Sequence, residues 1–253
     1  MKEKEIHFVL QGKGGVGKSF ISLLLIQYLQ EKNNGKTIGF DTDPVNSTFS
    51  KIRALDINTI NILDAHKKIN TAVFDGLITY LVEGDQQYAV IDNGSATFVP
   101  LMFYLMEGAV FEILKMNHFK IFIHIPIVGG QAASDTLESA QEILENLDAQ
   151  VVLWQNDFQG SATNIETLLN QYKNKILGVI HLPDRNPDTF GQDLRTMTQN
   201  NLTFKEVATH PLFNIMSRHR LKSVQNDVFT QLDTVLGETN HELPIEENTD
   251  KSE

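Results

Sequence analysis

A glycine-rich stretch at residues 10–19, LQGKGGVGKS, constrains this chain more than any other feature of its sequence. Glycine loses the most backbone entropy on folding and buries no side chain, so four glycines in ten residues need a reason. Residues 12–19 match the pattern G-x-x-x-x-G-K-[ST], which a chain of this length meets by chance about once in a hundred. An apolar, strand-like run precedes the pattern and a helix-like run follows it. This context predicts a phosphate-binding loop, and a glycine-rich structural turn is the alternative.

The residue types of this loop assign expected roles. Glycines let successive backbone N–H groups converge on phosphate oxygens, and the positive end of the following helix adds to the attraction. Lys18 is expected to reach the β- and γ-phosphates of a nucleotide, and the hydroxyl of Ser19 to bind Mg²⁺. The loop residues expected to contact the nucleotide are Gly12, Lys13, Gly14, Gly15, Val16, Gly17, Lys18, Ser19 and Phe20.

Apolar runs of strand length alternate with helix-like segments along the chain. The strand candidates cover residues 6–10, 37–40, 59–63, 88–91, 120–125, 151–154 and 176–180. Apolar residues recur at intervals of three and four in residues 18–32 and 131–146, which predicts helices there. We therefore expect an α/β, doubly wound fold with a mostly parallel sheet and helices on both faces. One domain is expected over residues 1–237, followed by an acidic, disordered tail over 238–253.

Composition excludes several classes of protein. The 253 residues contain no cysteine, so disulfides, Fe–S clusters and thiolate zinc sites are ruled out. The net charge is −11, from 21 Lys and Arg against 32 Asp and Glu, so direct DNA binding is not expected. The eight histidines show no metal-binding spacing. Without a signal peptide or a run of 18 apolar residues, we expect a cytoplasmic protein with no stable membrane insertion.

A phosphate loop also needs a carboxylate near the metal at the end of another strand. Asp92 closes the apolar run at residues 88–91 and is the candidate for this Walker-B role. An aspartate that merely begins a turn after a strand is the alternative.

The run KGGVGKS at residues 13–19 resembles the deviant Walker A motif of the ParA/MinD superfamily of ATPases, whose first lysine is the distinguishing feature. The resemblance implies that Lys13 reaches across a nucleotide-sandwich dimer to the partner's phosphates. Residues 41–44, DTDP, are similar to the family's D-x-D-P segment. By this resemblance Asp43 orients the attacking water and Asp41 lies nearer the metal. Without the family, these four residues read as a strand end that enters a turn.

Three longer strings resemble the TraL-type nucleotide-binding proteins encoded among plasmid conjugal-transfer genes. They are DTDPVNSTF at residues 41–49, VIDNGSATFVPL at 90–101 and IVGGQAASDTL at 127–137. Two segments depart from partition ATPases, which commonly have Gln-Gly-Asn after D-x-D-P and a proline-rich switch after the Walker-B aspartate. Here VNS at residues 45–47 and NGS at 93–95 stand in these places. Both departures lie in expected γ-phosphate-sensing segments, so they bear on the hydrolysis rate and on coupling to the partner, and not on nucleotide binding.

Base recognition has weaker candidates. Superfamily members often place an asparagine after the strand that ends here near Trp154, so Asn156 is a candidate for adenine contact and Pro183 for packing on the base. A plain loop asparagine is the alternative. Similarly, Gly129 and Gly130 before a helix form either a second anion-contacting turn or, as we favour, a helix entry.

The sequence therefore predicts an ATP- and Mg²⁺-binding, weakly hydrolysing switch. By resemblance it forms a homodimer in the ATP state and acts on a protein partner of the conjugation machinery. Two alternatives stay open: a ParA-type partition or positioning ATPase, and a small-molecule ATP-dependent ligase on the same scaffold. In the partition alternative, the basic residues Arg218, Arg220 and Lys222 form a switchable surface patch. Packing of the last helix on the sheet is the simpler expectation.

Overall fold

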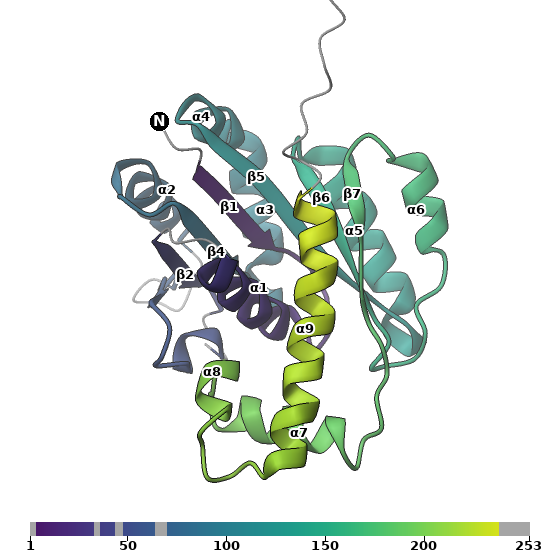
Figure 1. Cartoon of the computed structure of the whole chain (residues 1–253). Helices are drawn as coiled ribbons and strands as arrows, with labels where there is room; N and C mark the ends of the chain where they lie inside the picture. Colours follow the sequence, from purple (N-terminus) through teal and green to yellow (C-terminus); the bar gives the residue numbers. More distant parts are fainter. Residues whose placement is uncertain (1–3, 33–35, 44–47, 64–69, 238–253) are drawn as a thin grey trace, which may run out of the picture.

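The computed structural model describes residues 4–32, 36–43, 48–63 and 70–237. Seven strands form one parallel sheet in the order β3-β2-β4-β1-β5-β6-β7 (Figure 1). The strands are β1 Lys4–Val9, β2 Thr37–Asp41, β3 Ile57–Thr59, β4 Tyr88–Asp92, β5 Phe119–Val128, β6 Gln150–Asn156 and β7 Ile176–Leu182. All residues of β2 and β4 are buried, which explains why their apolar residues do not alternate with polar ones.

Helices cover both faces of the sheet, as expected for a doubly wound fold. The α-helices are α1 Lys18–Lys32, α2 Val73–Glu83, α3 Phe98–Glu107, α4 Val110–Met116, α5 Ala133–Asn146, α6 Ile165–Gln171, α7 Phe190–Gln199, α8 Phe204–Val207 and α9 Ile215–Gly237. Short 3₁₀ turns are η1 Phe49–Lys51, η2 Ser95–Thr97 and η3 Gly130–Ala132. One apolar core lies between the sheet and α2 to α6, and the other between the sheet and α1 with α7 to α9. In Figure 1, α1 and α9 cross in front of the sheet and α3 lies behind it. The expected fold class is confirmed.

The boundaries differ from expectation in two places. The third strand is Ile57–Thr59 instead of residues 59–63, because the Asn61 side chain accepts the N–H of Leu63 (3.2 Å) in a local turn. Ile62 is still fully buried. The apolar spacing therefore predicted correctly that this residue lies in the core, and incorrectly that it lies in a strand. Helix α5 begins at Ala133, after a 3₁₀ turn, instead of at residue 131. Residues 44–47 of the expected switch and the acidic tail at 238–253 lie outside the described residues.

Two fully buried histidines lie side by side on the central strands. Trp154 Nε1 donates to His124 Nδ1 (2.9 Å), which places the His124 proton on Nε2. That nitrogen lies 2.9 Å from His7 Nδ1, and His7 Nε2 lies 3.3 Å from a Glu5 carboxylate oxygen. Burial lowers the pKa of His124 well below its usual range. These histidines therefore belong to the core, in line with their lack of metal-binding spacing.

Helices α3 and α4 are unusually apolar for helices at the surface. In the described part of the chain, no single helix is long and apolar enough to cross a bilayer. The bent pair of residues 95–107 and 110–116, which meet at 62°, reaches the necessary length and composition together. Both helices also bury residues in the core under the sheet.

Candidate nucleotide-binding site

The glycine-rich loop connects the buried central strand β1 to helix α1. Gly15 and Gly17 have φ values of +75° and +97°, a backbone region that side chains with a Cβ rarely adopt. A Cβ on Gly17 would also lie 2.9 Å from Asn156 Nδ2. The loop therefore needs glycine at these two positions, and its backbone passes directly into the N-terminus of α1.

Lys18 lies inside this loop. Only 7% of the residue is exposed, and its Nζ donates to the carbonyl oxygen of Lys13 at 2.8 Å. Burial lowers the pKa of Lys18, while the charges of Asp92 and Asp43 oppose this change. A cation is thus held over the loop with two carboxylates nearby, which suits contact with nucleotide phosphates.

Asp92 ends strand β4 and is 1% exposed. Ser22 donates to its Oδ1 at 2.9 Å, and Ser19 also hydrogen-bonds to this carboxylate. Burial raises the pKa of Asp92 to about 6, against the opposing effect of the two serines. The structure therefore brings together Ser19 and Asp92, two of the three residues, with Asp41, that are expected at the metal.

These two side chains fit Mg²⁺. Phosphate-loop proteins hold this ion with a Ser or Thr hydroxyl, one or two carboxylates and substrate phosphates, not with a protein-only cage. Accordingly, a group of three or more His, Asp or Glu residues suited to a metal is not found among the residues that the structure describes. When bound, the ion neutralises charge on the nucleotide phosphates.

Asp41 and Asp43 lie at the end of the neighbouring strand β2. The fully buried Asp41 accepts the backbone N–H groups of Asp43 (3.0 Å) and Ser50 (2.8 Å), one on each carboxylate oxygen. Its visible role is to hold the segment that carries Asp43. Asp43 packs against Gly94, where a Cβ would lie 2.7 Å from its carboxyl carbon. The acid expected to orient water thus lies between Lys18 and the chain that follows Asp92.

A polar network that sequence reasoning missed joins these segments. Thr42 Oγ1 donates to the carbonyl oxygen of Asp92 (3.1 Å) and to Asn93 Oδ1 (3.2 Å). Thr97, at the entry to α3, also donates to Asn93 Oδ1. Asn93 Nδ2 is buried and lacks a partner among the described residues. The sequence signal that could have indicated this network is the position of Thr42 and Asn93 directly beside the acids already recognised as site candidates.

Beside the phosphate loop lies a cavity of about 420 Å³. It brings Asn156 and Pro183 together with Phe20 and Ser19, as expected for a base-binding site. The Asn156 amide, however, donates to the carbonyl oxygen of Val16 (3.1 Å) and accepts the N–H of Phe158 (3.3 Å). Asn156 therefore supports the phosphate loop from the side of the cavity. Other lining residues that were not singled out from the sequence include Phe158, His181, Asp184, Arg185 and Arg195.

The loop after β6 makes a second contact with the phosphate loop. Gln159 Nε2 donates to the carbonyl oxygen of Gly15 at 3.0 Å. On its other side, Gly160 accepts the N–H of Gly129 (3.1 Å), and a Cβ on Gly129 would lie 2.3 Å from that oxygen. Close backbone packing therefore requires Gly129, in addition to the expected helix entry. No local sequence pattern predicted that Gln159 contacts the phosphate loop.

Lys13 lies on the outer side of the loop, away from the base cavity. Its Nζ pairs with Asp135 Oδ2 of α5 at 2.6 Å, and the two side chains are 43% and 49% exposed. Glu138 and Glu142 of the same helix line the pocket beside it. The two lysines of the motif thus point to different surroundings.

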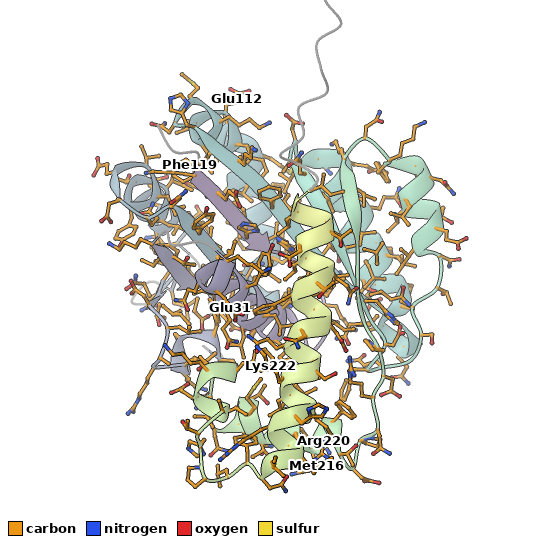
Figure 2. All side chains as sticks on the ribbon, in the orientation of Figure 1. Glu31, Glu112, Phe119, Met216, Arg220 and Lys222 are labelled. Carbon is orange, nitrogen blue, oxygen red and sulfur yellow. The ribbon has the colours of Figure 1, made fainter. Side chains whose placement is uncertain are left out.

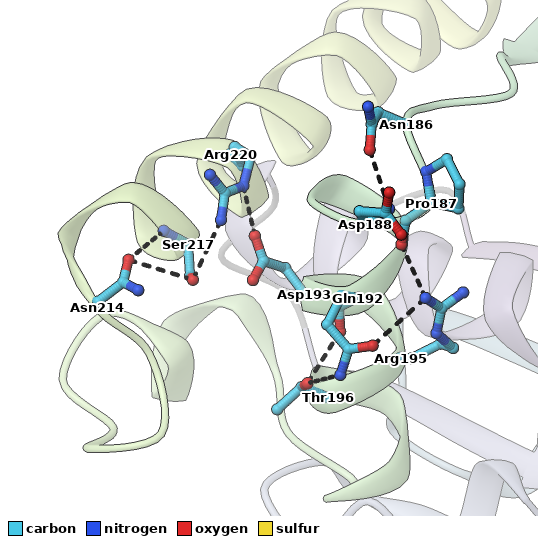
Figure 3. A network of polar contacts seen from close by, with 10 residues as sticks. All are labelled: Asn186, Pro187, Asp188, Gln192, Asp193, Arg195, Thr196, Asn214, Ser217 and Arg220. Carbon is cyan, nitrogen blue, oxygen red and sulfur yellow. Dashed lines mark hydrogen bonds and ion pairs between the residues drawn. The ribbon is translucent and has the colours of Figure 1, made fainter.

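The basic cluster at the start of α9 is not part of this site. Arg220 Nε pairs with Asp193 of α7 at 2.6 Å and contacts Ser217 (Figure 3). Arg218 donates to the carbonyl oxygen of His210 at 3.1 Å. In Figure 2, Arg220 lies near Met216 at the end of the molecule where α9 begins. These arginines hold α9 against its neighbours.

Comparison with known proteins identifies the family of this chain. The sequence model of the family described as "CobQ/CobB/MinD/ParA nucleotide binding domain" matches residues 7–197. Two Escherichia coli proteins, each named Protein TraL, are 37% identical to the chain over 239 and 238 residues, covering 90% of this chain and 97% of each relative.

Solved structures of low sequence identity are also similar. MinD cell division protein of Aquifex aeolicus is 15% identical with a TM-score of 0.49, covering 95% of this chain and 99% of that chain. A ParA family ATPase from Chlorobium tepidum is 13% identical with a TM-score of 0.49, covering 88% of this chain and 98% of that chain. By the sequence matches, the chain belongs to the CobQ/CobB/MinD/ParA family of nucleotide binding domains and is similar to Protein TraL.

Proposed function

We propose that this chain is an ATP-binding, weakly hydrolysing switch that dimerises around Mg²⁺-ATP and acts on a protein partner in plasmid conjugal DNA transfer. The observation that carries the proposal is the different placement of the two motif lysines. Lys18 is buried in the loop, whereas Lys13 is half-exposed and paired with Asp135 at the surface. A lysine on the outer side of the loop is available to a second chain.

In the binding step, backbone N–H groups of residues 14–19 face the phosphates, and Lys18 supplies the positive charge. Ser19 and Asp92 hold the metal, with Asp41 positioning the adjacent segment. The cavity next to the loop is lined by Phe20, Asn156 and Pro183. This cavity suits the base and ribose of the nucleotide. The resemblance to the deviant Walker A ATPases favours adenine.

In the hydrolytic step, Asp43 orients the water that attacks the γ-phosphate. Its support is its place beside Gly94 and within electrostatic reach of Lys18. The segment at residues 45–47 departs from the partition ATPases, so turnover is expected to be slow. Slow turnover is appropriate for a switch, because the bound state must persist long enough to be recognised.

In the dimer, Lys13 leaves Asp135 and contacts the phosphates held by the second chain. An exposed ion pair contributes only about 0.2–1 kcal/mol, so this exchange needs little energy. A conjugal role rests on the TraL-type resemblance, and the partner is a protein because the basic cluster at Arg218 and Arg220 is already occupied. Tight, salt-dependent binding of duplex DNA in the ATP state would instead favour the partition alternative.

The test is the nucleotide dependence of the oligomeric state, measured by sedimentation with ATP and Mg²⁺. We expect wild type to form a dimer only with nucleotide, and Lys13→Ala to bind ATP and remain monomeric. Asp43→Ala is expected to keep the dimer and lose turnover. Lys32→Ala is the matched control, because Lys32 and Asp233 form a pair of the same length (2.6 Å) and similar exposure (42% and 44%). A dimer that persists in Lys13→Ala contradicts the proposal.

A further inference from the structure

Six of the ten large apolar side chains that are exposed among the described residues lie on one side of the sheet. Of the described residues, Tyr80 of α2, Val99, Phe103 and Met106 of α3, and Ile113 and Met116 of α4 are 42–80% exposed. Figure 1 shows α3 on the side of the sheet opposite α9. Single exposed apolar residues are ordinary, whereas a group on adjoining helices marks an interaction surface.

Helix α3 lacks the polar face that a surface helix normally has. Phe98, Leu101, Met102 and Leu105 are buried in the core. Val99, Phe103 and Met106 follow at positions i, i+4 and i+7, so they form one outward stripe about 10 Å long. The only charged residue of the helix is Glu107, at its end. A helix that is apolar on all sides is normally covered, and here the described residues leave one side uncovered.

The charges around this stripe are predominantly negative. Tyr104 of α3 donates to Asp75 of α2 at 2.7 Å, which places that carboxylate beside the stripe. Between residues 73 and 116 the exposed acids are Asp75, Glu83, Asp85, Glu107 and Glu112, of which Asp85 is paired with Lys36 at 2.6 Å. Lys115 is the exposed base in the same range and is paired with Asp148 at 2.5 Å. Figure 2 shows Glu112 at the outer edge of the molecule.

We propose that the α3 stripe is a docking surface for a basic amphipathic helix of a partner protein, with apolar anchors on Val99, Phe103 and Met106 and Lys or Arg toward the acidic rim. Charge decides between the occupants. A second copy would bring the same acidic rim against this one, and like charges across an interface cost several kcal/mol. An anionic membrane would repel the rim in the same way.

The surface is connected to the nucleotide site by the chain itself. Helix α3 begins six residues after Asp92, and Thr97 at its entry holds Asn93. Gly14 of the phosphate loop lies close to Ser95, because a Cβ placed on Gly14 would lie 3.3 Å from Ser95 Oγ. A partner helix on α3 therefore lies one short segment from the γ-phosphate side of the site. Docking itself needs neither nucleotide nor dimer, so it goes beyond the proposed function.

The experiment uses the full chain and fluorescent synthetic peptides of about 18 residues, long enough to form a helix. One peptide is an amphipathic Leu/Lys helix, and its counterpart replaces every Lys by Glu. Fluorescence anisotropy is measured for wild type, Phe103→Ser and Glu107→Lys. The matched control is Ile215→Ser, since Ile215 is 80% exposed but lies on α9. Circular dichroism checks that each variant is folded.

We expect wild type and Ile215→Ser to bind the Leu/Lys peptide equally and the Leu/Glu peptide not at all. Phe103→Ser is expected to weaken binding by about tenfold or more, and Glu107→Lys by about threefold. Equal binding by Phe103→Ser and wild type overturns the proposal, as does equal weakening in Ile215→Ser. Loss of the ATP-dependent dimer in Phe103→Ser without loss of peptide binding would assign the stripe to a second copy. Phe103-dependent sedimentation with vesicles of anionic phospholipid would assign it to a membrane.

Discussion

Lys13 and Lys18 lie five residues apart in one loop, yet the fold places them in opposite surroundings. Lys18 is buried, its pKa is lowered, and it contacts the backbone of the loop. Lys13 is half-exposed and forms an ion pair with a helix far away in the sequence. A buried charge interacts strongly with a ligand and is sensitive to change, whereas an exposed pair is weak and exchangeable. The inner lysine therefore suits binding and the outer lysine suits switching.

Replacing the inner lysine should have the largest effect. Lys18→Ala removes a desolvated, charge-assisted contact to phosphate, so we expect ATP affinity to fall by about a hundredfold, roughly 3 kcal/mol. Isothermal titration calorimetry with Mg²⁺-ATP measures this change. Lys13→Ala serves as the comparison and should alter the affinity of the monomer by less than about threefold. Equal losses in the two variants would remove the distinction between the lysines.

Folding stability and Mg²⁺-dependent ATP affinity should also depend on pH through the buried carboxylate of Asp92. Because burial raises the pKa of Asp92 to about 6, the folded protein binds more protons than the unfolded chain between about pH 4 and 6. The contribution of Asp92 to stability therefore falls as pH rises through this window. Mg²⁺ needs the ionised carboxylate, so Mg²⁺-dependent ATP affinity should fall up to about tenfold per pH unit below about 6.

The check is calorimetric titration of ATP with and without Mg²⁺ from about pH 5 to 7.5. Asp92→Asn is the control, because its side chain cannot ionise in this range. The pH dependence of the Mg²⁺ contribution should disappear in that variant. A wild-type Mg²⁺ contribution that stays constant across this range would show that Asp92 does not hold the ion.

Releasing the outer lysine should have a smaller effect of opposite sign. Asp135→Asn frees Lys13 from its surface pair, so we expect ATP-dependent dimerisation to strengthen by up to about fivefold, the range of an exposed ion pair. Sedimentation at several protein concentrations measures the dimer dissociation constant. Asp233→Asn, which frees Lys32 from a pair of the same length, should leave the dimer unchanged. Weaker dimerisation in Asp135→Asn would mean that this acid itself contacts the second chain.

The smallest expected change concerns the support of the loop from outside. Gln159→Ala removes one exposed hydrogen bond to the Gly15 carbonyl, so ATP affinity should decrease by only about twofold, the lower end of what a single hydrogen bond contributes. Gln155→Ala is a suitable control, since Gln155 bonds to Asp157 instead of the phosphate loop. Both variants are compared by titration at neutral pH. An unchanged affinity in Gln159→Ala would limit support of the loop to Asn156.

Prediction from the sequence succeeded where the information is local. Strand β4 and the acid that ends it follow from an uninterrupted apolar run and one Asp at residue 92. It failed at β3, where the side chain of Asn61 turns the chain although the apolar spacing continues. Asn156 was found as a cavity residue, but its contact with Val16 was not, since that contact joins residues 140 positions apart.

The sequence by itself determined the phosphate loop, the parallel sheet and the positions of the carboxylates at strand ends, because each depends on residue type, spacing and the context of neighbouring elements. Only the tertiary structure decided that Lys13 pairs with Asp135, that Gln159 supports the loop, and that the described residues leave the outer stripe of α3 exposed. Each of these depends on which elements the packing brings side by side. Contacts across 122 or 144 positions of sequence leave no periodic pattern, so the packed chain alone reveals them.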